Sequence, residues 1–236
     1  MTNSRRICAW LGALTFAMTG CSGIDGNGER IDQTRDTAAF SRVRSDCELD
    51  VEIAQGGETS LTVSIDSNLQ DLVETRVQDD TLFVNLKDDV DRVVDGPHVM
   101  ITVPALTAAK LGGSGSMTLG FDQPERALDL YLSGSGSLRF DGTTAALGAS
   151  LSGSGDLLLS GETSNAELRL SGSGAIRARN LKATSAAIDL SGSGNVAATV
   201  LGSASVSLSG SGEIDLYGGA SLDAYHHSGS GDLHRH

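Results

Sequence analysis

Apolar and polar residues alternate with a period of two through most of the chain after about residue 40. Residues 129–132, 167–170 and 205–208 each place a leucine or valine at every second position. This alternation predicts β-strands with one buried and one exposed side, and none of these segments shows the 3.6-residue period of a helix. We therefore expect an all-β fold, with a helical turn at most between Asn68 and Val73.

The tetrapeptide Ser-Gly-Ser-Gly recurs between these strands at nearly constant intervals. Counted at the second serine, successive copies lie 21, 19, 19, 20, 18 and 19 residues apart, and residues 112–115 form a variant first copy. Such a period is typical of stacked repeats, and glycine permits sharp corners and close approach of neighbouring backbones. The pattern predicts a parallel β-solenoid with coils of about 19–20 residues. We expect a structural role at the corners for Gly113, Gly115, Gly134, Gly136, Gly153, Gly155, Gly172, Gly174, Gly192, Gly194, Gly210, Gly212, Gly229 and Gly231.

Two other architectures explain the repeat less well. A flexible Gly/Ser linker would lack apolar residues at fixed offsets on both sides of each copy. A β-propeller blade needs roughly twice this period. In a solenoid the second serines of the repeats would form a ladder along one edge; these are Ser135, Ser154, Ser173, Ser193 and Ser211.

Residues 40–104 alternate less regularly, and we expect them to form an irregular β cap on the regular coils. The odd-numbered residues Val43, Leu49, Val51 and Ile53 are apolar, and Cys47 lies in register with them. Cys47 is therefore expected to behave as a small buried residue without a disulfide partner.

The N-terminus has the features of a bacterial lipoprotein signal. Residues 1–20 combine a basic start with a short apolar segment, which predicts a secretory signal peptide rather than a spanning helix. Met18-Thr-Gly-Cys21 resembles a lipobox, so Cys21 is the expected site of lipidation, and Ser22 is compatible with sorting to the outer membrane. Residues 21–38 are rich in Gly, Asp and Asn, which predicts a flexible tether before a single domain at residues 39–236.

The formal net charge of the chain is −13. An acidic surface disfavours nucleic acid, which requires basic patches, and favours solubility. The expected partners are therefore the membrane, through the lipid anchor, together with an envelope protein or glycan. An oligomer remains open, and no cofactor is expected.

A family resemblance rests on segments between about residues 38 and 233. These are Phe40 and Val43, residues 47–53, residues 61–63 and the phrase Ile-Thr-Val-Pro-Ala-Leu at 101–106, followed by the Ser-Gly repeats. In this order they resemble the bacterial family called "putative auto-transporter adhesin, head GIN domain", a domain of unknown function. The resemblance implies a right-handed, single-stranded-type parallel β-helix in a protein of the bacterial cell envelope. It supplies no catalytic or ligand-binding residues.

Motifs of catalysis are absent from the sequence: G-x-S-x-G, a Walker motif, CxxC and HExxH do not occur. Asp88, Asp89, Asp91 and Asp95 could hold a hard cation or form a solvated acidic loop. Histidines crowd the last eleven residues and could bind zinc or nickel, or be incidental; they are His226, His227, His234 and His236.

Three functions are compatible with these features. The first is a non-enzymatic, lipid-anchored module that binds a ligand or has a structural role at the envelope, with Tyr131 and Tyr217 as a weak sugar platform or as ordinary surface residues. The second is a self-assembling scaffold. The third is a polysaccharide-active enzyme, for which only the shared repeat position of Asp156, Glu213 and Asp232 offers carboxylates.

Overall fold

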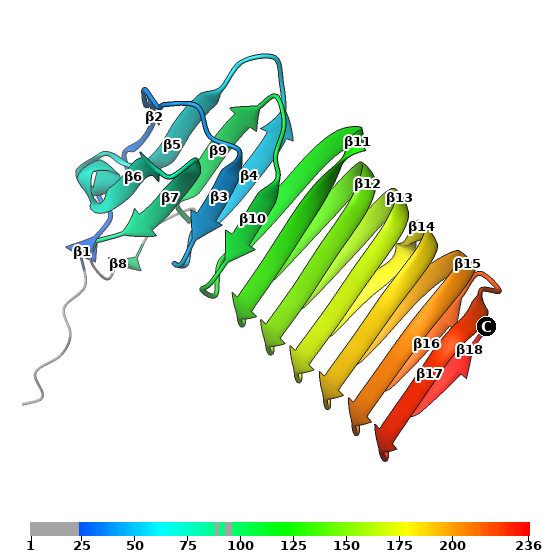
Figure 1. Ribbon diagram of the computed structural model, residues 1–236. Coiled ribbons are helices and arrows are strands. Elements are labelled where there is room, and N and C mark those ends of the chain that lie inside the picture. The colour runs from blue at the N-terminus through cyan, green and yellow to red at the C-terminus, as the bar shows by residue number, and fades with distance from the viewer. Residues whose placement is uncertain (1–23, 88–89, 93–95) are drawn as a thin grey trace, which may run out of the picture.

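The computed structural model describes residues 24–87, 90–92 and 96–236. The predicted signal peptide, Cys21 and most of the acidic run at 88–95 lie outside these residues. The fold is a β-solenoid with an irregular cap at its N-terminal end (Figure 1), which confirms the predicted class. The described part contains no helix that is long and apolar enough to cross a membrane.

Five long strands form the regular coils, and each pairs in parallel with the next along nearly its whole length. Each strand bends once, so that its two halves lie on opposite sides of the solenoid. They are β11 (Ser116–Gly134), β12 (Ser137–Gly153), β13 (Asp156–Gly172), β14 (Ala175–Gly192) and β15 (Asn195–Gly210). The last coil is split into β16 (Glu213–Tyr217), β17 (Ser221–Gly229) and β18 (Asp232–Arg235).

The two sides of the solenoid are continuous sheets. Side 1 consists of the strand halves that follow a glycine corner, and it continues through β16 and β18. Side 2 consists of the halves that precede the next corner, and it continues through β17. Leucine, valine, isoleucine and alanine at alternate positions fill the space between the sides as one core, as the period-two pattern predicts.

The cap extends both sides. On side 1, β4 (Asp50–Gln55) pairs with β11 and β9 (His98–Val103), and β5 (Ser60–Asp66) pairs with β9. On side 2, β10 (Ala108–Leu111) pairs with β11 and β3 (Arg42–Ser45), and β7 (Thr81–Leu86) lies between β3 and β6 (Val73–Gln78). A 3₁₀ helix at Ser67–Leu72 joins the sides, where a helical turn was predicted.

Strands β3 and β4 form a first coil that the glycine pattern does not reveal. Its corner, residues 46–49, lies beside residues 112–115 of the next coil, and Ser114 donates a hydrogen bond to Glu48 Oε1 at 2.8 Å. These two coils are 66 residues apart in sequence because β5 to β9 are inserted between them. The periodicity hides this coil because the insertion breaks the spacing.

The predicted tether at residues 21–38 contains strands in its described part, which corrects the expectation of flexibility. β2 (Arg30–Thr34) pairs antiparallel with β5, and β1 (Ile24–Asp25) pairs with β8 (Val90–Arg92). Arg35 extends the attachment, because its guanidinium donates hydrogen bonds to the carbonyls of Val73 and Gln70 at 2.5 and 2.7 Å. The Gly- and Asp-rich composition concealed this edge strand because β2 is exposed along its length.

The corners explain why glycine recurs in pairs. The first glycine of each full repeat has a positive φ, for example +139° at Gly153, a conformation that side-chain-bearing residues rarely adopt. A Cβ on the second glycine would collide with the preceding coil: at Gly155 it would lie 2.3 Å from Gly136 O. Backbone hydrogen bonds also join successive corners, since Ser154 N and Gly155 N both donate to Gly134 O.

Cys47 is only partly buried, although the alternation predicted a buried residue. Its Sγ lies 3.5 Å from Ser45 Oγ and 3.6 Å from Val84 O, at the margin of the core. Burial raises the pKa of the thiol. The cysteine is free, so no disulfide forms among the described residues.

Candidate binding face

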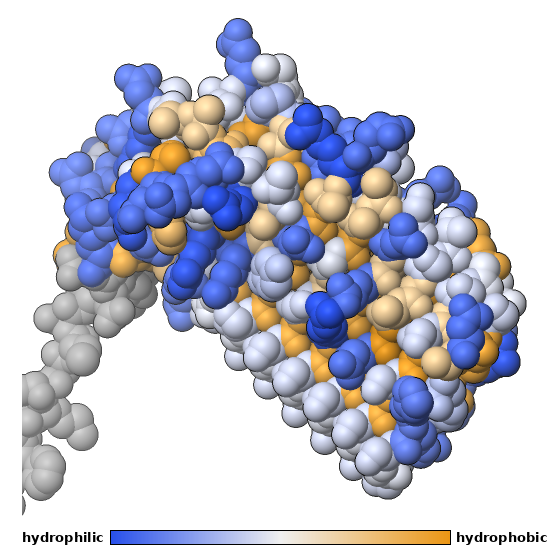
Figure 2. Space-filling model, in the orientation of Figure 1, coloured by the Kyte–Doolittle hydropathy of each residue, from blue (hydrophilic) through white to orange (hydrophobic). Residues whose placement is uncertain are grey.

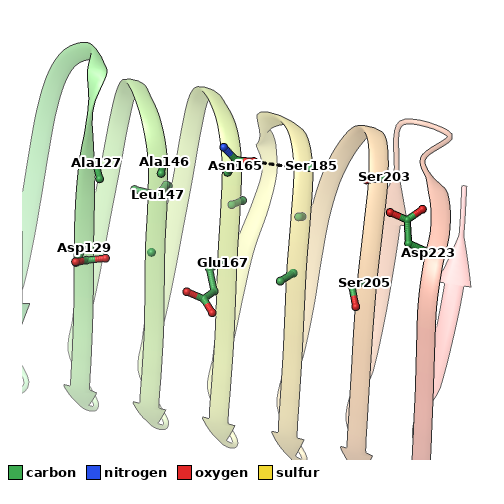
Figure 3. Close-up of a pocket in the computed structure, with 14 residues that line it drawn as sticks. Ala127, Asp129, Ala146, Leu147, Asn165, Glu167, Ser185, Ser203, Ser205 and Asp223 are labelled. Atoms are coloured by element: carbon green, nitrogen blue, oxygen red, sulfur yellow. Dashed lines mark hydrogen bonds between the residues drawn. The ribbon is translucent and has the colours of Figure 1, made fainter.

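Side 2 carries a shallow trough that crosses the coils from β11 to β17, close to the bends (Figure 3). Its volume is about 440 Å³, and it runs perpendicular to the strands along the solenoid axis. Each strand from β11 to β15 contributes two or three residues at equivalent positions, and β17 contributes one. The lining consists of Ala127, Asp129, Ala146, Leu147, Gly148, Asn165, Ala166, Glu167, Ser185, Ala186, Ala187, Ser203, Ser205 and Asp223.

The trough exists because small side chains repeat at its floor. Ala127, Ala146, Asn165, Ser185 and Ser203 follow one another in register across five strands. None of them extends far from the sheet, and Ser185 Oγ binds Asn165 Oδ1 at 2.6 Å. The floor therefore stays open along the axis instead of being filled by long side chains.

A second row adds carboxylates to the trough. Asp129, Gly148, Glu167 and Ala187 lie in register, so acidic and small residues alternate. A Cβ at Gly148 would lie 2.3 Å from Asp129 Oδ1, which shows that the Asp129 carboxylate leans over this glycine. Alternation thus makes room for the carboxylates at the sheet surface.

The residues that line the trough carry a net negative charge. Its three charged residues are Asp129, Glu167 and Asp223, on three different strands (Figure 3), and it includes no lysine or arginine. Arg169, beside the trough, forms an ion pair with Glu167 on its own strand. The remaining carboxylates, Asp129 and Asp223, are exposed and can accept hydrogen bonds from hydroxyl or amine groups of a ligand.

The two tyrosines predicted as a sugar platform lie on opposite sides of the solenoid. Tyr131 belongs to the second half of β11 on side 2, and Tyr217 ends β16 on side 1. Tyr217 stacks on His236 with ring centroids 4.4 Å apart, and the Arg179 guanidinium lies 4.5 Å from its ring centroid. The solenoid therefore does not bring the two rings together.

The C-terminal histidines are divided in the same way. His226 and His227 lie on β17, whereas His234 pairs with Glu213 at 3.0 Å and His236 with Asp215 at 2.8 Å on side 1. Within the described ranges, no group of three or more His, Cys, Asp or Glu side chains is placed to hold a metal ion. The acidic run that could hold a cation lies mostly outside those ranges.

The shared repeat position of Asp156, Glu213 and Asp232 appears as one row on side 1. Glu213 and Asp232 are direct neighbours, but Asp156 is separated from them by Ala175 and Asn195 and pairs with Arg177 at 2.7 Å. The serines of the expected ladder are all exposed at the corner edge.

The trough was missed at the level of the sequence. Most of its residues are Ala, Gly, Ser and Asn, they form no catalytic or ligand-binding motif, and equivalent positions lie 18 to 20 residues apart. The small residues at matching offsets before each Ser-Gly-Ser-Gly were the available signal. Only the register between coils shows that they form one continuous floor.

Comparisons with known proteins agree with this architecture. The profile of the family described as "Putative auto-transporter adhesin, head GIN domain" matches residues 39–220. A "putative adhesin" from Bacteroides fragilis NCTC 9343 superposes with a TM-score of 0.81 at 24% identity, covering 90% of this chain and 99% of that chain. A "Putative lipid binding protein" from Parabacteroides distasonis ATCC 8503 gives a TM-score of 0.74 at 22% identity, covering 91% and 100%.

A further "putative adhesin", from Parabacteroides merdae ATCC 43184, superposes with a TM-score of 0.68 at 18% identity, covering 91% of this chain and 99% of that chain. At such identities the likeness shows the fold alone. No match was found among curated proteins.

Proposed function

Since the chain belongs to the family described as "Putative auto-transporter adhesin, head GIN domain", we propose that it is a non-enzymatic binding module of the cell envelope. In this proposal a lipid on Cys21 holds the chain at the outer membrane, and the solenoid presents side 2 to an extended ligand. The lipobox-like residues 18–21 support the anchor. The trough from β11 to β17 supports the binding role.

The trough is the observation that carries the proposal. It is long, open and crossed by many strands, so it fits an extended chain better than a compact molecule. Five strand spacings separate β11 from β17, which gives a length of about 24 Å. A linear ligand lying along the axis would meet residues at equivalent positions on successive coils.

The chemistry of the lining favours a glycan. Asn165, Ser185, Ser203 and Ser205 offer amide and hydroxyl groups, and Asp129 offers a carboxylate acceptor for sugar hydroxyl or amine groups. The absence of lysine and arginine from the lining disfavours a polyanion. We therefore propose a neutral or amine-bearing glycan of the envelope as the ligand class.

A lipid ligand fits the described residues less well. Lipid-binding sites bury most of an apolar ligand in a concave, largely apolar space. The interior of this solenoid is instead filled by its own leucine, valine and isoleucine side chains, and the trough is open and half polar.

Co-sedimentation with insoluble chitin, an uncharged linear glycan, tests the binding role. The wild-type chain, Ala146→Phe in the trough and Ala197→Phe on side 1 are compared, because both alanines are partly exposed and the change is the same. We expect wild type and Ala197→Phe to sediment with the glycan and Ala146→Phe to lose at least tenfold in affinity. Equal behaviour of the two variants, or no binding by wild type, would refute the proposal.

A further inference from the structure

One row of outward side chains on side 2 is complementary to itself. Lys110, Tyr131, Ser150, Arg169 and Asp189 lie in register on five consecutive strands from β10 to β14. Ser150 is at the centre, with Tyr131 and Arg169 one strand away on either side. Lys110 and Asp189 lie two strands away. The outer pair has opposite charges, and the inner pair combines an aromatic ring with a guanidinium.

These groups are available to a partner. Tyr131 is 43% exposed, and the side chain of Arg169 is 58% exposed although it also pairs with Glu167. Within the described residues, the Lys110 ammonium and the Asp189 carboxylate have neither an ion pair nor a hydrogen bond. Each unpaired charge thus has its complement on the same row of the same chain.

Self-complementarity about a centre is the property of an isologous interface, in which one patch meets its own copy across a two-fold axis. A two-fold axis parallel to β12 and passing over Ser150 would place two chains face to face with antiparallel solenoid axes. Lys110 would then lie opposite Asp189 of the second copy, and Tyr131 opposite Arg169 of the second copy. We propose that side 2 is a homodimer interface with this symmetry.

The flanking rows permit this approach. Toward the corner, the row contains Gly112 and four serines, at 133, 152, 171 and 191. Toward the bend, Gly148 lies at the centre, and Asp129 would face Glu167 of the second copy. The two carboxylates would repel each other. In each copy, however, Arg169 forms an ion pair with Glu167, and this positive charge offsets the repulsion.

Figure 2 displays side 2. Pale, small residues cover much of the coils, and isolated blue side chains stand between them. Nine strands from β7 to β17 would overlap, over about 38 Å by about 16 Å, or roughly 600 Å² per copy. This is at the small end of specific interfaces, so a weak and reversible dimer is expected.

The dimer goes beyond the proposed function and does not depend on it. In the two-fold arrangement, the axis passes over β12, so only the β11–β13 part of each trough would face the trough of the second copy. A glycan could then lie between the copies, or it could compete with the second copy. Dimerisation is therefore measured without added glycan.

Cross-linking at the centre of the row tests the symmetry. The full chain carries Ser150→Cys in a background of Cys8→Ser, Cys21→Ser and Cys47→Ser, so the introduced thiol is unique. Packed sheets lie about 10 Å apart, so a short bismaleimide can join two thiols that meet on the axis. We expect covalent dimers from Ser150→Cys.

Ser207→Cys is the matched control, since Ser207 is on the same row and is partly exposed like Ser150. It lies three strands from Ser150, so its two copies would be about 29 Å apart and should not be joined. Equal cross-linking of both variants, or none from Ser150→Cys, would overturn the proposed axis.

Charge reversal tests the outer pair by sedimentation equilibrium at about 0.15 M salt, where charges more than about 8 Å apart are screened. Lys110→Glu and Asp189→Lys should each weaken the dimer at least tenfold, and the double variant should restore it to within threefold of wild type. Lys182→Glu, which makes the same charge change at the bend, should leave it unchanged. A wild type that stays monomeric up to its solubility limit refutes the dimer.

Discussion

The coils and the cap bury the same kinds of side chain but turn their corners differently. From β11 onward, every corner contains a pair of glycines, whereas the corner of the first coil carries Cys47 and Leu49 at the matching positions. A corner therefore requires glycine only when it packs against the corner of the preceding coil. A Cβ at Gly113 would lie 2.6 Å from Cys47 O in the corner of the preceding coil. The corner at residues 46–49 belongs to the first coil, and no Ser-Gly corner comes before it in the sequence. Glycine is needed where one corner stacks on another.

The two regions also differ in charge. Residues 24–104 contain 18 acidic and seven basic residues, whereas residues 105–236 contain 12 acidic and eight basic ones. Most of the negative charge thus belongs to the cap, and the coils present a surface of small residues that is close to neutral. A second acidic chain is therefore repelled less by the coils than by the cap, of which only β7, β3 and β10 would lie in the proposed overlap.

The largest effect is expected from a change at a stacked corner. Gly155→Val places a branched side chain against Gly136 O and Leu132, so neighbouring coils must separate. We expect a loss of at least about 3 kcal/mol in the free energy of unfolding, measured by denaturant titration. Gly120→Val is the control, because a Cβ at Gly120 meets nothing within 4 Å. Equal stability of the two variants would contradict the stacking role.

A core truncation compares how damage spreads in the two regions. Leu168→Ala in the coils and Leu61→Ala in the cap each remove a buried side chain that is 1% exposed. Each should lower the free energy of unfolding by about 2–5 kcal/mol. Hydrogen exchange should rise mainly in β12 to β14 for Leu168→Ala, since coils contact only their neighbours. Uniform loss of protection over both regions would contradict this locality.

A smaller effect is expected where residues after β2 attach to the cap. Arg35→Gln leaves the carbonyls of Val73 and Gln70 without their charged donor, which should cost about 1.5–3 kcal/mol. Urea titration measures the change, and Arg76→Gln, whose guanidinium donates to a side-chain oxygen of Gln78, serves as the control. If residues 24–38 were a flexible tether, Arg35→Gln would match the control.

The smallest effect concerns the thiol of Cys47. Because burial raises its pKa, less of the thiol is ionised at neutral pH than in the unfolded chain. Iodoacetamide at about pH 7.5 should therefore modify Cys47 more slowly in the native chain than in urea. The same shift makes native stability fall as the pH rises past the ordinary thiol pKa, because only the unfolded state then loses the proton readily. Equal alkylation rates would contradict the burial.

The regular coils could be read from the sequence because one local rule repeats. Leucines at alternate positions and glycines at fixed spacing report strands and corners without knowledge of distant contacts. The cap could not be read in this way. Arg30–Thr34 is exposed and forms a strand only because β5 offers it an edge, and the first coil depends on pairing across 66 residues.

The trough and the self-complementary row could not be predicted from the sequence for the same reason. Gly148 and Ser150 are unremarkable in the sequence, and their significance comes from the residues in register beside them. Conversely, Tyr131 and Tyr217 share a polar, strand-side setting in the sequence, yet the fold places them on opposite sides. Cross-strand register, which no single repeat contains, decides both outcomes.

Anchoring at the envelope is tested most directly by fractionating cells that express the wild-type chain or Cys21→Ala, followed by protease treatment of intact cells. We expect the wild type in the outer-membrane fraction, with acyl chains on Cys21 by mass spectrometry, and Cys21→Ala in the soluble fraction. Cleavage on intact cells would place the coils outside, and protection would direct the glycan search to the periplasm. A wild-type chain that is soluble and carries no lipid would contradict the anchored module.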